Sequence, residues 1–287
     1  MNSDDRLELR TVALALLASL VLWNLPFGGL VLYPFKLFAT WLHELSDGIA
    51  MVATGAGLDS VVIYRDTSGL AYARAPVTAT GPAVIAGAGY MGTALWGAVL
   101  LVVTPTGPAA RVALLVLAAL LGVSAVSVIA IQGEDAFGPW SVGVMAVVVA
   151  ALALMLPDRW RRAVAHFVAA QACVNALLDI RVLLRPAQVV GGQLTGRSDA
   201  HSMALATFGT AAPWAVWTWA AVWLGWSLVV LYVAMRFSGS PALTSVVPAG
   251  RATASPPGGS DHGAHRRSPD SAPGGTDPSG PAGTAGS

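Results

Sequence analysis

Charged residues are scarce in this sequence of 287 residues. Aspartate, glutamate, lysine and arginine together make up 11% of the chain, whereas hydrophobic residues make up 55%. A soluble domain usually has about 25% charged residues, so this composition excludes an ordinary soluble domain. The mean hydropathy of +0.65 leads to the same conclusion. The sequence therefore predicts an integral membrane protein that crosses the bilayer several times.

Cysteine and lysine each occur once, as Cys173 and Lys36. A single cysteine excludes an internal disulfide, and the apolar neighbours of Cys173 indicate a packed thiol. The net charge is +1, without a basic stripe, which argues against a nucleic-acid partner. The preference for arginine, with many alanines and glycines, is typical of a GC-rich genome. We therefore interpret the chain as a bacterial protein and expect it in the plasma membrane.

Composition divides the chain into three regions. Residues 1–10 form a polar N-terminus, and residues 11–237 contain the apolar runs and form the membrane domain. Residues 238–287 consist mainly of glycine, proline, serine, threonine and alanine. Such a segment buries too little apolar surface to offset the entropy lost on ordering. We expect it to be a disordered tail.

The apolar runs predict an all-α polytopic membrane protein with about six or seven transmembrane helices. The first run, residues 11–33, follows an acidic start, which favours a retained helix kinked near Pro26 over a cleaved signal peptide. A second helix starts at Pro34 and is expected to stop at the glycines of residues 55–57. Further spans are expected at residues 84–103, 111–131, 140–156, 163–184 and 213–235. Tryptophans in the last span are interpreted as markers of the membrane interface; they are Trp214, Trp217, Trp219, Trp223 and Trp226.

A change of pattern after the second helix predicts a small β-hairpin. Residues 61–64 and 70–73 are β-prone, and residues 65–69 between them favour a turn. An open strand edge beside a membrane helix can accept an extended peptide as an additional strand. The hairpin is therefore a candidate for holding a substrate.

Three ionisable residues, His43, Glu44 and Asp47, lie within the second apolar segment. Such groups are expensive inside a membrane and are usually functional. On a helix His43 and Asp47 share a face, and Glu44 lies about 100° away. This spacing matches the zinc-binding pattern His-Glu-x-x-His, in which two histidines bind the metal and the glutamate takes a proton from the attacking water. Asp47 stands in the place of the second histidine.

Two further polar groups lie later in the chain. Asn175 and Asp179 are four residues apart, so they share one face of an apolar span. Ser198 is a candidate helix N-cap, and we interpret Asp199 and His201 as a cap and an exposed residue. The glycines of residues 87–92 are interpreted as sites of close helix packing, because no strand precedes them and no lysine followed by serine or threonine comes after them.

The polar and glycine-rich stretches described above, in the order in which they occur along the chain, resemble a bacterial branch of the site-2 protease family of intramembrane zinc metallopeptidases. The resemblance rests on His43-Glu44 with the strand pair after it, and on residues 88–92, 175–179 and 198–200, and it extends roughly from residue 30 to residue 236. It implies an intramembrane endopeptidase in the lipid bilayer, acting on a membrane-protein or peptide substrate.

The resemblance implies His43 as the first metal ligand, Glu44 as the general base and Asp179 as a carboxylate ligand from a distant helix. Asp47 departs from the family pattern, although a carboxylate can also bind zinc. One imidazole with two carboxylates is a harder set, which suits manganese or iron(II) better than the family set does. We expect zinc, and the alternatives are manganese, iron(II) or a metal-free site.

Other interpretations of the same residues stay open. The ionisable groups can form a structural cluster, and Asp179 can pair with an arginine such as Arg185. Asn175 can support a metal ligand or an oxyanion, or it can form a hydrogen bond between helices. The alternative function is that of a non-catalytic relative that binds transmembrane segments as a scaffold or regulator. A transporter is disfavoured because no inverted repeat is visible.

Overall fold

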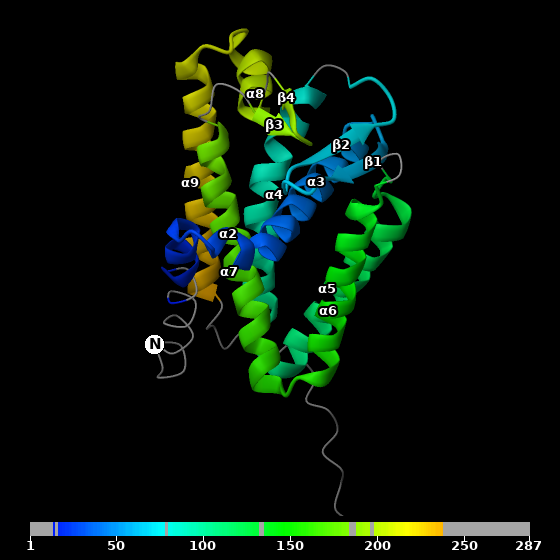
Figure 1. Cartoon of the computed structure of the whole chain (residues 1–287). Helices are drawn as coiled ribbons and strands as arrows, with labels where there is room; N and C mark the ends of the chain where they lie inside the picture. Colours follow the sequence, from blue (N-terminus) through cyan, green and yellow to red (C-terminus); the bar gives the residue numbers. More distant parts are fainter. Residues whose placement is uncertain are drawn as a thin grey trace, which may run out of the picture. The chain divides into compact units, whose positions relative to one another are not determined.

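The structure, a computed structural model, describes Leu14 and residues 17–77, 80–131, 135–183, 188–195 and 198–237. These residues form a mainly helical membrane protein with two small antiparallel sheets (Figure 1). In chain order the elements are α2 (Gly28–Val31), α3 (Tyr33–Ala53), β1 (Leu58–Ile63), β2 (Gly69–Ala73), α4 (Gly81–Val103), α5 (Gly107–Ser127), α6 (Phe137–Met155), α7 (Asp158–Leu183), β3 (Gln188–Val190), β4 (Gln193–Thr195), α8 (Asp199–Phe208) and α9 (Pro213–Phe237). The polar N-terminus predicted at residues 1–10 and the tail predicted at residues 238–287 lie outside the described residues.

Among the described residues, five helices are long and apolar enough to cross a membrane: α4, α5, α6, α7 and α9. The predicted number of six or seven is therefore slightly too high. The first apolar run is helical at residues 17–24 but leaves the helix at residues 25–27, around Pro26. Helix α3 contains Lys36, Glu44 and Asp47, which make it more highly charged than an ordinary span.

The ends of helix α3 follow from its sequence. Pro34 occupies the first turn of α3. Backbone N–H groups in a first turn have no hydrogen-bond partner within the helix, so proline, which lacks an N–H, fits there. At the other end Gly55 and Gly57 have φ values of +84° and +69°. The Gly57 amide donates a hydrogen bond to the Met51 carbonyl at 3.0 Å, which closes the helix. The predicted glycine stop is confirmed.

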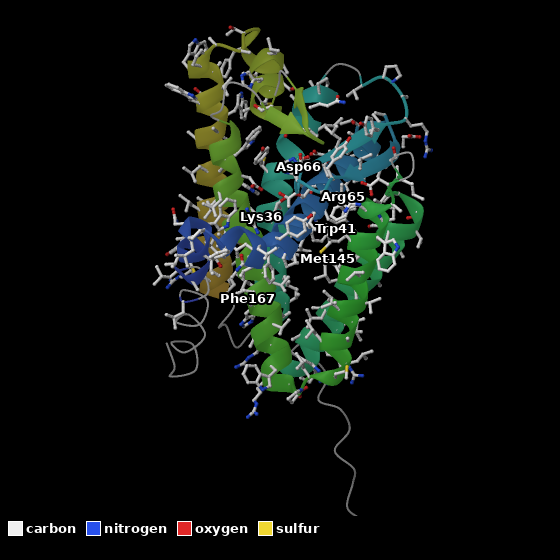
Figure 2. The ribbon with its side chains drawn as sticks, in the orientation of Figure 1. Lys36, Trp41, Arg65, Asp66, Met145 and Phe167 are labelled. Atoms are coloured by element: carbon white, nitrogen blue, oxygen red, sulfur yellow. The ribbon has the colours of Figure 1, made fainter. Side chains whose placement is uncertain are left out.

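Helix α3 has two chemically different faces. Its apolar face packs into a core with β1, α5 and α6, where Trp41 lies together with Met145 (Figure 2). Its other face is a polar stripe of residues three or four apart, namely Lys36, Thr40, His43, Glu44 and Asp47. The apolar contacts hold the helix in place, so the polar stripe is directed toward other elements.

The predicted β-hairpin is present as the antiparallel pair β1 and β2. The other edge of β1 is partly occupied, because the amide of Val61 donates to the Val128 carbonyl and its carbonyl accepts from the Ala130 amide, each at 2.8 Å. Val61 lies opposite Ala71 in the register. The polar backbone groups of Ala71 therefore point away from β1, toward the outer edge of β2. Among the described residues, no strand pairs with that edge.

A second hairpin, β3 and β4, was not predicted. Its two-residue turn consists of Gly191 and Gly192, with φ values of +58° and +77°, a conformation that favours glycine. The Gly191 amide donates to Ser68 Oγ at 3.0 Å, and the Gly192 amide donates to Asp66 Oδ2 at 3.2 Å. The tip of the second hairpin is therefore joined to the turn of the first.

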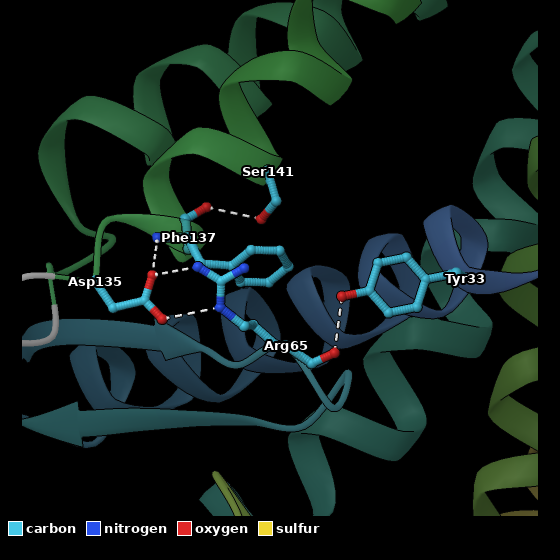
Figure 3. A network of polar contacts seen from close by, with 6 residues as sticks. Tyr33, Arg65, Asp135, Phe137 and Ser141 are labelled. Carbon is cyan, nitrogen blue, oxygen red and sulfur yellow. Dashed lines mark hydrogen bonds and ion pairs between the residues drawn. The ribbon is translucent and has the colours of Figure 1, made fainter. Parts of the chain in front are cut away.

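Arg65 ties the β1–β2 turn to the loop before α6 (Figure 3). Its guanidinium donates to both carboxylate oxygens of Asp135, at 3.1 and 2.9 Å, and the Phe137 amide donates to Asp135 Oδ1 at 2.9 Å. The Arg65 carbonyl also accepts a hydrogen bond from the Tyr33 hydroxyl at 2.7 Å. The hydrogen bonds from Arg65 and from the Phe137 amide hold the pKa of Asp135 below its ordinary value.

The Arg65–Asp135 contact predicts a pH titration that can be measured. Because the pKa of Asp135 is lowered in the folded protein, the ion pair persists through mildly acidic pH and is lost as the pH falls through that lowered pKa. The amide NMR shift of Phe137 should report this midpoint, and Arg65→Gln should move it to higher pH. Arg74→Gln, on the same hairpin, is the control and should leave it unchanged. An identical midpoint in Arg65→Gln and the wild type would contradict the assignment.

Candidate active site

The polar stripe of α3 presents His43, Glu44 and Asp47 to the interior of the bundle. Glu44 and Asp47 are only 6% and 7% exposed, and the His43 side chain is 17% exposed. A buried charge is costly unless a partner compensates it. The neighbours of these three side chains therefore determine what the site can do.

Two carboxylates face the same nitrogen of His43. Nε2 lies 3.5 Å from Asp47 Oδ2, one turn along α3, and 3.5 Å from Asp199 Oδ2, at the start of α8. The hydroxyl of Ser198 caps α8 by accepting a hydrogen bond from the His201 amide. The interpretation of Asp199 as a cap is wrong, because Ser198 has that role. His201 is half-buried, and its Nδ1 atom lies 2.7 Å from Ser198 Oγ.

The two predicted residues of α7 also lie near α3. Asp179 is half-buried and interacts electrostatically with His43 and Lys36. Arg185, its predicted alternative partner, lies outside the described residues. Asn175 is 2% exposed, and its amide donates to the Phe35 carbonyl of α3 at 3.2 Å. That bond is the predicted contact between helices, whereas a role of Asn175 toward a metal or an oxyanion stays a prediction.

Glycines allow the site to be compact. A Cβ atom added to Gly89 would overlap the imidazole of His43, and one added to Gly92 would overlap the Ser46 hydroxyl. Close packing of α4 on α3 is therefore confirmed as the role of these glycines. A Cβ at Gly69 would lie 2.7 Å from Glu44 Oε1, so strand β2 also approaches the site closely.

Aromatic rings enclose the histidine on the α4 side. The rings of His43 and Tyr90 meet edge to face, with centroids 4.7 Å apart and an angle of 87°. Tyr90 in turn stacks on Trp223 of α9, at 4.8 Å and 3°. Trp223 is fully buried, so its interpretation as an interface marker is wrong, whereas Trp214 and Trp217 are exposed. The sequence analysis did not identify Tyr90 as a site residue.

The separations around His43 are compatible with a bound cation as well as with ion pairs to the imidazole. Zinc bonds to nitrogen and oxygen are about 2.0–2.2 Å long, so two ligand atoms of one tetrahedral ion lie about 3.4 Å apart. The two 3.5 Å separations from Nε2 match this spacing and exceed a normal hydrogen bond. Among the described residues, however, no three His, Cys, Asp or Glu side chains converge as a ready metal centre. The donors fit a metal in type and in pairwise spacing, and a third ligand would have to move inward.

The charges around the site also favour a cation. The phenol of Tyr90 interacts electrostatically with four carboxylates, namely those of Asp199, Asp179, Asp47 and Glu44. Asp47 Oδ1 is buried, and no hydrogen-bond partner for it exists among the described residues. In the described part of the chain, His43 and Lys36 are the positive or potentially positive groups that interact with these carboxylates. A divalent cation would compensate the excess of negative charge.

A large apolar cavity lies away from this chemistry. It has a volume of about 480 Å³ and lies between α3, α4, α5 and α7, where Phe38 and Leu42 of α3 contribute to its wall. These two side chains belong to the apolar face of α3, opposite the polar stripe. We therefore place the candidate active site at the stripe and not in the cavity.

Comparisons with known proteins identify a family. The model of the Peptidase M50B-like family matches residues 12–234, which is most of the chain. Searches of curated proteins and of solved structures gave no match. The matched region contains all the residues of the candidate site, four of the apolar helices completely and α9 as far as Ala234, as expected for a metallopeptidase-like integral membrane protein. The chain belongs to the Peptidase M50B-like family, in agreement with its resemblance to the site-2 proteases.

Proposed function

We propose that the protein is an intramembrane metalloendopeptidase of the bacterial plasma membrane that cleaves membrane-protein or peptide substrates. The observation that carries this proposal is the position of His43 Nε2, which lies 3.5 Å from carboxylate oxygens of both α3 and α8. The buried Glu44 lies next to His43 in the chain, and the chain belongs to a peptidase family.

The proposed metal ligands are His43, Asp47 and a third carboxylate. The spacing supports Asp199 as the third ligand, and the family resemblance supports Asp179. When bound, a divalent cation supplies Lewis acidity, which polarises a carbonyl and acidifies water. Zinc is the proposed ion, although the carboxylate-rich set also suits manganese or iron(II).

Glu44 has the role of general base. Its carboxylate accepts a proton from water while the water oxygen bonds to the carbonyl carbon of the peptide. The same carboxyl group then gives the proton to the departing nitrogen as the C–N bond breaks, which yields a carboxylic acid and an amine. Burial of Glu44 beside the backbone of Ala71 keeps this group at a fixed place relative to the hairpin.

The outer edge of β2, with which no described strand pairs, is the proposed substrate-binding strand. Ala71 directs its polar backbone groups to this edge, where its amide interacts with the Glu44 carboxylate and its carbonyl is left to accept from a substrate amide. A substrate segment that pairs with this edge would be extended, which exposes a peptide bond that a helix shields. Gly69 has no side chain, which lets the Glu44 and Thr40 side chains of α3 lie directly against β2, so a segment on this strand would lie close to Glu44.

Metal analysis combined with cleavage is the main test. Purified wild-type protein should contain stoichiometric metal, and His43→Ala should lose it. Glu44→Gln should keep the metal but cleave transmembrane peptides in liposomes about 10²–10⁴-fold more slowly, because it lacks the base. Absence of stoichiometric metal, together with unchanged cleavage by Glu44→Gln, would refute the proposal.

A second comparison identifies the third ligand. We expect Asp199→Asn to weaken zinc affinity more than about 100-fold. This loss is larger than the loss of a residue that only forms a hydrogen bond to a metal ligand would cause. We expect Asp179→Asn to have a smaller effect on zinc affinity. The exposed Asp59 of β1 provides the control variant Asp59→Asn, which should bind like the wild type. The reverse order of the two effects would assign the ligand to α7.

A non-catalytic scaffold that binds transmembrane segments is the second candidate function. Two observations favour it: Asp47 replaces a histidine of the family pattern, and no three ligands converge among the described residues. In this function the same buried groups would stabilise the bundle, and the free edge of β2 would still bind an extended segment.

Restoring the histidine separates the two functions. If the protein is an enzyme, Asp47→His should keep the metal and shift its preference from manganese toward zinc, because imidazole is the softer ligand. Competition titration with the two ions measures this preference. If the wild type has neither metal nor activity and Asp47→His gains both, the chain is a decayed protease.

A further inference from the structure

The orientation of the His43 ring depends on its contacts with α4. Gly89 leaves room for the imidazole, and the next residue, Tyr90, places its ring at 87° to it. Tyr90 is 6% exposed, and its other contact is the nearly parallel ring of the fully buried Trp223. Helices α3, α4 and α9 thus meet in one cluster of three rings.

These ring contacts orient the imidazole of His43, a function that a hydrogen bond usually has in a metal-binding histidine. A metal-binding histidine normally donates its second ring N–H to a carboxylate, a carbonyl or water, which fixes the direction of the ligating nitrogen. In the part of the chain that the structure describes, the polar contacts of His43 are those of Nε2 with Asp47 and Asp199. The ring contacts remain as the restraint on the plane of the imidazole.

We propose that Tyr90 is a positioning residue, which holds the His43 ring so that Nε2 faces the carboxylates of α3 and α8, with Trp223 as its support. The inference rests on the proposed metallopeptidase function and adds two residues to its site. Tyr90 acts through its aromatic ring, because the ring makes both contacts. Trp223 acts only through Tyr90.

Substitutions that keep or remove the ring test this role in the purified full-length protein. Tyr90→Phe keeps the ring and should bind Zn²⁺ within about twofold of the wild type. Tyr90→Leu removes it and should weaken Zn²⁺ binding about 10–100-fold, as loss of an orienting partner does. Tyr232, a 60% exposed tyrosine of α9, gives the control variant Tyr232→Leu, which should bind like the wild type.

A second readout does not require metal. In metal-free protein with ¹³C-labelled histidine, Tyr90→Leu should broaden the imidazole resonance of His43 beyond the shift that loss of the tyrosine ring current causes, because the imidazole is no longer held in one orientation. Trp223→Leu should change this resonance and the Zn²⁺ affinity in the same direction, although Trp223 is further from His43; it also serves if Tyr90→Leu does not fold. The His43 resonance is assigned by its absence in His43→Gln.

Each outcome decides the inference. It is overturned if both leucine variants keep the wild-type Zn²⁺ affinity and the wild-type His43 resonance. It is also overturned if Tyr90→Phe loses as much Zn²⁺ affinity as Tyr90→Leu, because the effect would then belong to the hydroxyl. Failure of the wild type to bind Zn²⁺ would instead contradict the proposed function. In that case the resonance of His43 in the variants still decides whether Tyr90 positions the ring.

Discussion

Burial of carboxylates on α3 is the constraint on which the rest of the structure depends. Glu44 and Asp47 are almost inaccessible, in a bundle whose other helices are mostly apolar. Their desolvation must be compensated by partners or by a cation. The apolar face of α3 provides the anchoring that makes this burial stable, because it packs on β1, α5 and α6. The apolar face of α3 thus stabilises the bundle, and the opposite face carries the buried groups of the candidate site.

Individual residues of α4 fit against the polar side of α3. Gly89 permits a contact with His43 that any other residue would block, and Gly92 does the same for Ser46. Tyr90 lies between them and adds a ring where the glycines leave space. A stretch of small residues with one aromatic therefore brings two helices close and also limits the movement of the imidazole.

Features encoded by neighbouring residues could be predicted from the sequence. Pro34 and Gly57 set the ends of α3, and the spacing of His43 and Asp47 sets their common face. Asp199 could not be assigned in this way, because its contact with His43 depends on how the chain returns after α7. Its place in Ser198-Asp199-Ala200, part of the family resemblance, was the available signal. The glycine pair of β3–β4 was also a local signal, of a two-residue hairpin turn.

The two hairpins connect the carboxylate of α8 back to the helix that bears the histidine. Thr40, one turn before His43, donates a hydrogen bond to the Thr67 carbonyl at 2.5 Å. The same turn contains Asp66, which accepts from the Gly192 amide at the tip of the second hairpin. That hairpin precedes α8, whose first residue is Asp199. The two hairpin turns are therefore held against α3 by these hydrogen bonds, so a substrate strand that displaced the second hairpin would break the contact between Gly192 and Asp66.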